Sequence, residues 1–300
     1  MSGAIEQPHV RPWSTVFRAT TDQGDVYLKL CGPSQAHEPA LTALLAGAGG
    51  GLVPEVIAIH PREPWMLLGD GGERIRDVLT GPALLETWAT LLPRYAEIQR
   101  AFLGREDAVL ACGTPDRRLD RLVRDLQVLV EDDRVLRVAG DAFGPAERER
   151  LRALLPRIEA RCDELASTGI GATVQHDDLH DGNVLSDRIR TVIFDWGDAS
   201  LTHPFLSLGV ILEAAAQRAG LDKRDAQILR LRAAYLEPWT VRLGRPALDA
   251  AADQGERLST VTRALSWYRV VALTEGVLED QPAMVGEYLG KVLGALGPER

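Results

Sequence analysis

Residues 176–183 read HDDLHDGN, and residues 194–198 read FDWGD. The first stretch holds three carboxylates, two imidazoles and a carboxamide within eight residues, a polar density that core packing does not require. The apolar residues that follow Asn183 and precede Asp195 flank a tight polar Asp-Arg turn and predict a β-hairpin. Because the two ends of an antiparallel hairpin lie side by side, we expect Asn183 and Asp195 to be neighbours.

These side chains match the demands of phosphoryl transfer. That reaction needs cations on the triphosphate, an oriented attacking hydroxyl and a group that accepts its proton. Mg²⁺ prefers oxygen ligands, commonly one or two from the protein and the rest from water and phosphate. The oxygens of Asn183 and Asp195 are therefore predicted to hold this ion, and Asp178, one loop earlier, is predicted to face the hydroxyl.

The spacing of these residues also resembles a family pattern. In the aminoglycoside phosphotransferases, which are relatives of choline kinases, fructosamine kinases and, more distantly, protein kinases, a His and an Asp separated by one residue precede an Asn and a second Asp. His176, Asp178, Asn183 and Asp195 occupy those positions. The resemblance implies that Asp178 orients or deprotonates the substrate hydroxyl, that Asn183 and Asp195 hold magnesium, and that His176 is a structural anchor.

An upstream lysine and glutamate follow the same family order. Residues 27–30 read YLKL and resemble the strand whose lysine, here Lys29, reaches the α and β phosphates of the nucleotide. Glu38 opens the next predicted helix and corresponds to the family's partner for that lysine. We therefore expect Lys29 and Glu38 to pair.

Two further segments are predicted to contact the nucleotide. Residues 65–72 read WMLLGDGG and resemble the interlobe hinge, whose backbone takes the base, so Gly69 and Asp70 are the hinge candidates. The turn that covers the phosphates should precede Val16, but residues 11–15 contain no glycine-rich motif. Ser14 is the phosphate contact proposed there.

The sequence departs from the family pattern at two positions. Asp177 stands where the family often has glycine, and we expect it to face solvent, with a substrate contact as the alternative. Ser207 stands where the family often has an aspartate in a Pro-x-x-Asp-Leu context. Since that aspartate is largely structural, activity is expected to survive its absence.

The order of elements predicts an α+β protein with a two-lobed protein-kinase-like fold. At 300 residues the chain exceeds what one hydrophobic core usually serves. A small β-sheet with one helix is expected in residues 1–69, the nucleotide-binding lobe. A mainly α-helical lobe with the catalytic loop, metal-binding hairpin and substrate pocket is expected in residues 70–300. Strands are predicted over 14–19, 26–30, 56–60 and 65–68, and helices over 36–46, 82–103, 117–130, 145–166, 223–243, 248–278 and 283–296.

Composition narrows the partners and the compartment. The net charge of −9 counts against nucleic acid, because phosphate backbones are bound by clustered Lys and Arg. No run of about 18 apolar residues and no leader-like apolar region is present, so no membrane partner and a cytoplasmic location are expected. The three cysteines show no metal or redox spacing and are expected to be reduced.

Several polar and aromatic residues have structural interpretations. His180 is expected to be a loop hydrogen-bonder, and Asp198 either neighbours the metal or caps the next helix. Trp267 and Tyr268 are expected in the core, with a substrate pocket as the alternative. Alternating charges are expected to form an exposed, salt-bridged helix face, made by Asp116, Arg117, Arg118, Asp120, Arg121, Arg124 and Asp125.

The predicted reaction is an ATP- or GTP-dependent, Mg²⁺-assisted transfer of a phosphoryl group to a hydroxyl of a small molecule. Aminoglycosides, aminosugars and amino alcohols all remain open as acceptors, and so does the oligomeric state. A protein kinase is disfavoured because residues 201–213 read as a helix where a substrate-docking segment and an APE-like motif are needed. A non-catalytic nucleotide-binding module and a hydrolase are also alternatives, but the former would usually lack one of the four key residues, and no GxSxG or HExxH motif supports the latter.

Overall fold

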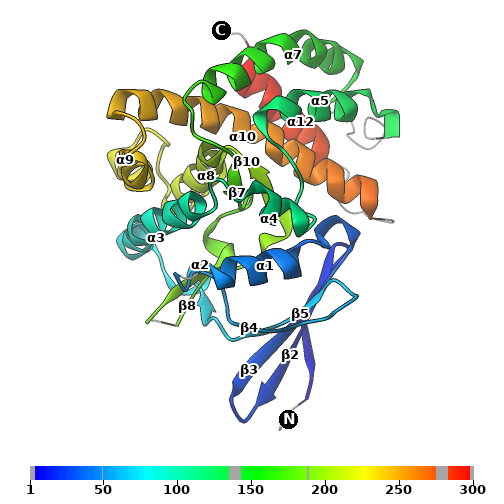
Figure 1. Cartoon of the computed structure of the whole chain (residues 1–300), viewed down its shortest axis with the longest axis vertical. Helices are drawn as coiled ribbons and strands as arrows, with labels where there is room; N and C mark the ends of the chain where they lie inside the picture. The colour runs from blue at the N-terminus through cyan, green and yellow to red at the C-terminus, as the bar shows by residue number, and fades with distance from the viewer. Residues whose placement is uncertain (1–3, 49, 135–142, 188, 275–282, 298–300) are drawn as a thin grey trace.

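The computed structural model describes residues 4–48, 50–134, 143–187, 189–274 and 283–297. In this part of the chain, the N-terminal residues form a five-stranded antiparallel sheet with strand order β1-β2-β3-β5-β4. The strands are β1 (Glu6–Arg11), β2 (Ser14–Thr21), β3 (Gly24–Cys31), β4 (Val56–Ile59) and β5 (Trp65–Gly69). Figure 1 shows this sheet at one end of the molecule and the helices at the other.

Strand β1 was not predicted from the sequence, and its position explains why. It is an edge strand whose side chains are mostly exposed, and it contains Pro8. Proline and polar residues are tolerated at a sheet edge, where one row of backbone groups faces solvent. The segment therefore lacks the apolar alternation by which the other four strands were recognised.

One helix lies between the sheet and the rest of the molecule (Figure 1). This helix, α1 (Glu38–Gly47), follows the short 3₁₀ turn η1 (Pro33–Gln35) and buries Leu41 and Leu45. Its first residue is Glu38, whose side chain is fully buried beside the sheet. The helix was predicted to begin two residues earlier, a difference within the usual uncertainty of helix ends.

The remainder is mostly helical, as predicted. Its longest helix, α10, contacts α5, α7, α8 and α12 and so forms the centre of this part. The helices are α2 (Ile75–Val78), α3 (Gly81–Ala101), α4 (Glu106–Ala111), α5 (Leu119–Glu131), α7 (Pro145–Ala166), α8 (Ser207–Ala219), α9 (Ala226–Leu236), α10 (Arg245–Leu273) and α12 (Ala283–Leu296).

Two predicted helices differ from those in the structure. The stretch 223–243 contains the shorter helix α9, followed by the 3₁₀ turn η6 (Glu237–Trp239). The run 201–213 begins as strand β10 (Ser200–Thr202), continues as the 3₁₀ turn η5 (Pro204–Leu206), and becomes helical only at Ser207. Pro204 accounts for the delay, since proline fits the first turn of a helix but not its interior. Residues 275–278, the predicted end of the helix over 248–278, lie outside the described residues.

Two small sheets hold the polar loop in place. The predicted hairpin is formed by β8 (Val184–Ser186) and β9 (Thr191–Ile193), and β6 (Glu73–Arg74) pairs with β8. Within its Asp-Arg turn, Arg188 lies outside the described residues. Strand β7 (Thr173–Gln175), which leads into the loop, pairs with β10. Gly72 has φ +93°, and a Cβ there would overlap the backbone carbonyl of Ser186, so glycine is required where the chain leaves the N-terminal sheet.

The hydrophobic core lies among the helices around a group of packed rings. Phe205 packs edge-on against Trp239 and Tyr235, and Tyr95 contacts Tyr235 and Trp196. Cys31, Cys112 and Cys162 are free thiols, as expected. None of the helices in the described part of the chain combines the length and the hydropathy that crossing a bilayer requires.

Candidate active site

Lys29 joins three elements through its ammonium group. Its Nζ lies 2.8 Å from Glu38 Oε1 and 2.5 Å from Asp195 Oδ1, so the predicted pairing with Glu38 is confirmed. Burial disfavours the charge on Lys29, but Asp195 and Glu38 outweigh this effect and raise its pKa. Lys29 is therefore a permanent cation that connects strand β3, helix α1 and the segment after strand β9.

A cavity of about 360 Å³ opens beside this lysine. It is lined by the sheet on one side and by the hairpin on the other, with Leu68, Leu185 and Phe194 as apolar surfaces. Ser14, Gly69 and Asp70 also line it, so the structure brings the predicted nucleotide residues together around one space. Its volume lies within the range of about 300–1,000 Å³ that is typical of small-molecule sites.

The two hinge candidates differ in the backbone groups they can offer. The Gly69 N–H donates to Glu55 O at 2.9 Å, so this donor is already used. The Asp70 side chain accepts from Gly72 N at 2.9 Å and closes a tight turn at the edge of the cavity. Gly69 therefore lines the cavity without offering its own N–H, a detail that sequence resemblance does not reveal.

His176 connects the polar loop to the start of the FDWGD segment. It is fully buried, and burial lowers its pKa. Its Nε2 lies 2.9 Å from Phe194 O and its Nδ1 lies 3.3 Å from Asp178 N. A neutral ring that donates through Nε2 and accepts through Nδ1 satisfies both contacts. His176 thus holds the backbones of Asp178 and Phe194 together, which agrees with the anchor role that the resemblance implies.

Asp178 and Asn183 contact each other directly. Asn183 Nδ2 donates to Asp178 O at 2.9 Å and to Asp178 Oδ2 at 3.3 Å. None of the hydrogen bonds among the described residues uses Asn183 Oδ1. The amide nitrogen therefore orients the Asp178 carboxylate while the amide oxygen stays available to a cation.

The ends of the hairpin meet as predicted. Phe194 N donates to Asn183 O at 3.1 Å, which places Asp195 beside Asn183. Asp195 has a left-handed backbone with φ 64°, and its side chain, 38% exposed, lines the large cavity. The described residues contain no group of three or more His, Cys, Asp and Glu side chains in metal-binding geometry. One carboxylate and one amide oxygen nevertheless fit Mg²⁺, which takes most of its ligands from water and phosphate.

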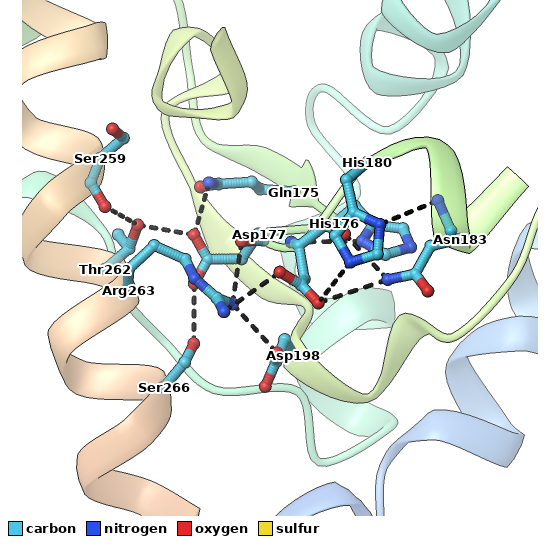
Figure 2. Close-up of polar contacts among 12 residues, drawn as sticks. Gln175, His176, Asp177, His180, Asn183, Asp198, Ser259, Thr262, Arg263 and Ser266 are labelled. Atoms are coloured by element: carbon cyan, nitrogen blue, oxygen red, sulfur yellow. Dashed lines mark hydrogen bonds and ion pairs between the residues drawn. The ribbon is translucent and has the colours of Figure 1, made fainter. Parts of the chain in front are cut away.

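Arg263, on helix α10, was not predicted as a site residue, yet it contacts Asp178. Its Nη2 lies 3.1 Å from Asp178 Oδ1, and its Nη1 lies 3.0 Å from Asp198 Oδ2 (Figure 2). Burial raises the pKa of Asp178, but Arg263 and His180 outweigh this effect and lower it to about 2. The carboxylate is therefore ionised at any ordinary pH. In the sequence, Arg263 is one of many arginines in a helical stretch, and nothing there marks it.

The expectation that Asp177 faces solvent is wrong. The residue is 1% exposed, and its carboxylate accepts hydrogen bonds from four side chains, three of which are labelled in Figure 2. The donors are Gln175 at 2.8 Å, Thr262 at 2.6 Å, Ser266 at 2.7 Å and Arg117 at 3.0 Å. Thr262 and Ser266 belong to α10, the helix that carries Arg263. Their hydrogen bonds to Asp177 therefore hold the polar loop against this helix.

Arg117 corrects a second expectation. It was assigned to an exposed, salt-bridged helix face, but it is 4% exposed and precedes helix α5. Its guanidinium pairs with Asp177, and its Nη1 also donates to Thr262 O. The pairing of Asp116 with Arg118 and Arg121 follows the expected pattern at the surface.

The remaining singled-out residues have structural partners. His180 Nδ1 accepts from Gly182 N, as expected for a loop hydrogen-bonder, and its Nε2 lies 3.5 Å from Asp178 Oδ2. Trp267 packs edge-on against Trp13. The Tyr268 hydroxyl donates to Asp132. The Ser207 hydroxyl lies 3.0 Å from the buried Tyr95 hydroxyl, and Gln99 donates to it.

The site therefore combines a cavity of small-molecule size, a buried cation, two oxygen donors and an ionised carboxylate. Comparison with known proteins agrees with this arrangement. The sequence profile of the APH family, described as the phosphotransferase enzyme family, matches residues 7–250. No curated protein sequence gives a significant match.

Solved structures with the same fold cover nearly the whole chain. A choline/ethanolamine kinase family protein from Mesorhizobium loti is 18% identical with a TM-score of 0.62, covering 99% of this chain and 89% of its own. The macrolide 2'-phosphotransferase MphH from Brachybacterium faecium is 19% identical with a TM-score of 0.60, covering 100% and 94%. A thermostable mutant of aminoglycoside phosphotransferase APH(4)-Ia, in ternary complex with ADP and hygromycin B, is 12% identical with a TM-score of 0.58, covering 99% and 95%.

At such low identity these likenesses show the fold alone, and they confirm the predicted α+β, kinase-like architecture. The profile match, in contrast, spans well over half of the chain and includes the lysine strand, the polar loop and the FDWGD segment. It confirms the resemblance identified from the sequence. The chain belongs to the APH phosphotransferase enzyme family.

Proposed function

We propose that this phosphotransferase moves the γ-phosphoryl group of ATP to a hydroxyl of a small molecule, with Asp178 as the catalytic residue. The observation that carries the proposal is the position of Asp178. Its carboxylate contacts Asn183, whose backbone carbonyl accepts from the cavity residue Phe194, and it contacts Arg263, with which it lines a second pocket. A hydroxyl in the second pocket would face a phosphate in the first.

The transfer proceeds by attack of the substrate hydroxyl oxygen on the γ-phosphorus. The new bond joins that oxygen to phosphorus, the bond from phosphorus to the bridging oxygen breaks, and ADP leaves with the electron pair. The hydroxyl proton passes to Asp178 or through it to solvent. Since the pKa of Asp178 is lowered to about 2, this carboxylate is a weak base. Its main contribution is to accept a hydrogen bond from the hydroxyl and fix its direction of attack.

We assign the nucleotide contacts to residues that line the large cavity. Lys29 would bind the α and β phosphates, held in place by Glu38, and Ser14 would contact the phosphates from the turn before β2. The segment at Gly69 and Asp70 would take the base, and we place the boundary between the two lobes there. ATP is the proposed donor because the related APH(4)-Ia structure contains ADP, and GTP is the alternative.

Asn183 and Asp195 are the proposed protein ligands of Mg²⁺. The unused amide oxygen of Asn183 and the partly exposed carboxylate of Asp195 suit a hard cation. Bound Mg²⁺ would neutralise charge on the phosphates. Lys29, which already contacts Asp195, would supply a second positive charge to the same phosphates.

A small-molecule acceptor is favoured over a protein acceptor by the chain after the metal segment. Asp195 is followed at once by the 3₁₀ turn η4 (Trp196–Asp198), the buried strand β10, the buried turn η5 and helix α8. A protein kinase needs a long substrate-docking segment at this point. The described residues leave no length for one.

The catalytic assignment is tested by Asp178→Ala. We expect phosphoryl transfer to fall at least about a hundredfold, the usual scale for loss of a positioned acid-base group. Binding of Mg-ATP, measured by calorimetry, should persist because the nucleotide cavity is intact. Asp120→Ala, at an exposed position on helix α5, is the control and should leave turnover unchanged. Near-normal turnover of Asp178→Ala would contradict the assignment.

The metal assignment is tested by Asp195→Ala. Here the affinity for Mg-ATP itself should fall, because both a metal ligand and the partner of Lys29 are removed. Calorimetric titration with and without Mg²⁺ measures the effect. We expect the magnesium dependence of nucleotide binding to weaken by at least about tenfold, which is about 1.4 kcal/mol. An unchanged magnesium dependence would show that the ion is held elsewhere.

A further inference from the structure

A second pocket lies on the other side of Asp178, among helices α8, α10 and α12. Its volume is about 190 Å³, and Asp178, Glu213, Arg263, Tyr288 and Lys291 are among its lining residues. This is smaller than the range of about 300–1,000 Å³ that is typical for drug-sized ligands. The pocket therefore suits a compact acceptor.

The two acidic side chains of this pocket already have partners. Asp178 Oδ1 pairs with Arg263, and Oδ2 accepts from Asn183. Glu213 Oε1 accepts from Gln217 at 3.1 Å, and its Oε2 accepts from Lys223 at 2.8 Å. Each carboxylate thus already has a cationic partner, Arg263 for Asp178 and Lys223 for Glu213, which offsets its attraction for ammonium groups on a substrate.

The cationic side chains are also ion-paired, Arg263 with Asp178 and Asp198 and Lys291 with Glu287, but each keeps a donor that these pairs do not use. Lys291 has three N–H donors, and its ion-pair partner among the described residues is Glu287, 3.0 Å away and outside the lining. The Nε–H of Arg263 is buried and has no hydrogen-bond partner in the described part of the chain. Because this Nε–H is enclosed, Lys291, whose side chain is 39% exposed, is the cation that a ligand in the pocket can reach.

Tyr288 brings these two cations together. Its ring lies 4.5 Å from Lys291 Nζ and 5.4 Å from Arg263 Cζ. Arg263 is ion-paired with Asp178 and Asp198, so Lys291 is the cation of the pocket whose only ion-pair partner in the described part of the chain, Glu287, lies outside the lining. The positive charge of Lys291 is opposite in sign to the net charge of the whole protein, −9. Because charges more than about 8 Å apart are screened at physiological salt, this local charge decides what binds.

On this basis, and given the proposed function, we propose that the acceptor is a compact hydroxyl compound carrying an anionic group, a carboxylate or a phosphate, and that Lys291 selects it. The anionic group lies against Lys291 and Tyr288, and the hydroxyl faces Asp178. A polycationic aminoglycoside would place ammonium groups against two cations and find the acids already paired. The preferred substrate thus differs in charge from the antibiotics of the family name.

The test uses four compounds with one three-carbon skeleton: glycerol, glycerate, glycerol 3-phosphate and 3-amino-1,2-propanediol. Their dissociation constants are measured by ligand-observed NMR on the full chain with Mg²⁺ and a non-hydrolysable ATP analogue. We expect both anions to bind at least about tenfold more tightly than glycerol, and the amine more weakly than glycerol. The comparison of glycerate with glycerol 3-phosphate distinguishes a carboxylate from a phosphate as the preferred group.

Charge reversal at Lys291 makes the test specific. Lys291→Glu should weaken binding of both anions at least about tenfold and leave glycerol little changed. Arg230→Glu changes the net charge by the same amount at an exposed position on α9 outside the pocket, and should leave anion binding unchanged. Equal binding of the four compounds, no binding of the anions, preference for the amine, or no effect of Lys291→Glu would overturn the proposal.

The outcome is separable from that of the proposed function. If the anions bind in a Lys291-dependent way but Asp178→Ala still transfers phosphate, the catalytic assignment fails and the pocket assignment stands. If Asp178→Ala abolishes transfer but the amine is the better ligand, the catalytic assignment stands and the proposal of an anionic acceptor is wrong.

Discussion

Asp177 shows how much a single residue contributes to this site. Its φ of 63° lies in the left-handed region, which side chains with a Cβ rarely adopt. Four hydrogen bonds to its buried carboxylate hold it there, two of them from helix α10. A glycine would fit the backbone but would lose these bonds. In this chain the loop is therefore held by its side chain as well as by its backbone.

Removing this carboxylate should strongly destabilise the protein. Asp177→Ala leaves the buried Arg117 without its counter-ion, and breaking one partner of a buried pair costs about 3–5 kcal/mol. Urea unfolding measures the change in the free energy of unfolding. Asp120→Ala, at an exposed position on α5, is the control and should change it by less than about 0.5 kcal/mol. Equal effects of the two substitutions would show that the Asp177 network is not stabilising.

At the residue scale, the sequence predicts the residues that share a local motif and misses those that act from far away in the chain. Asp178, Asn183 and Asp195 were identified because loop and hairpin place them together. Arg117 and Arg263 contact the same loop, but the sequence contains many arginines, and no local pattern distinguishes a buried one. The prediction that Asp177 faces solvent was wrong for the same reason. Three of the four side chains that donate hydrogen bonds to its carboxylate lie far from it in sequence.

At the scale of elements, the contact of helix α8 with helix α10 shapes the pocket beside Asp178. Gly209 on α8 lies against α10, where a Cβ would overlap the Ser259 hydroxyl and lie 3.0 Å from Glu256 O. The same helices supply Glu213 and Arg263 to the pocket. The long helices were predicted from their periodicity. Strands β6, β7 and β10 were not, because each has only two or three residues and is fixed by pairing with distant segments.

A methyl group at this contact should separate the two helices. Gly209→Ala is expected to lower the free energy of unfolding by about 1–3 kcal/mol, the usual cost of overpacking. Gly290→Ala is the matched control, since this glycine lies in helix α12 with open space around its Cβ position. It should stabilise the protein by about 0.5–1 kcal/mol through helix propensity alone. Thermal unfolding of both variants measures the difference, and the same sign for both would contradict the packing argument.

At the scale of the whole molecule, contacts between distant residues join the N-terminal sheet region to the rest of the chain. Lys29 pairs with Asp195, Trp13 packs edge-on against Trp267 at 5.7 Å between ring centroids, and Arg269 donates to Ser34 O at 2.9 Å. Two of these contacts, those of Trp267 and Arg269, involve helix α10. The sequence predicted two regions around a nucleotide site, but these contacts between distant residues appear only in the fold.

Two buried histidines make the stability of the whole molecule depend on pH. Burial lowers the pKa of His37 and of His203 to about 3, whereas each is near 6.5 when unfolded. As the pH falls below about 6.5, the unfolded chain binds protons that the folded chain cannot. The free energy of unfolding therefore falls as the pH drops below about 6.5. At about pH 5 each histidine accounts for a loss of about 2 kcal/mol.

The variant His203→Asn isolates one of these contributions, because asparagine can replace the histidine as the cap of turn η5. Urea unfolding at about pH 7 and about pH 5 gives the loss of stability on acidification for each protein. We expect this loss to be about 2 kcal/mol smaller in the variant than in the original chain. Equal losses would mean that His203 takes up a proton in the folded state.

The central claim is that Asp178 directs a substrate hydroxyl at the γ-phosphate of a nucleotide that other residues bind. The most direct measurement is single-turnover transfer from γ-labelled ATP to an anionic hydroxyl acceptor, for the original chain and for Asp178→Asn, with nucleotide affinity measured in parallel. We predict that Asp178→Asn binds Mg-ATP with an affinity within about threefold of the original and transfers phosphate at least about a hundredfold more slowly. Transfer at an undiminished rate by Asp178→Asn, with nucleotide affinity preserved, would contradict the claim.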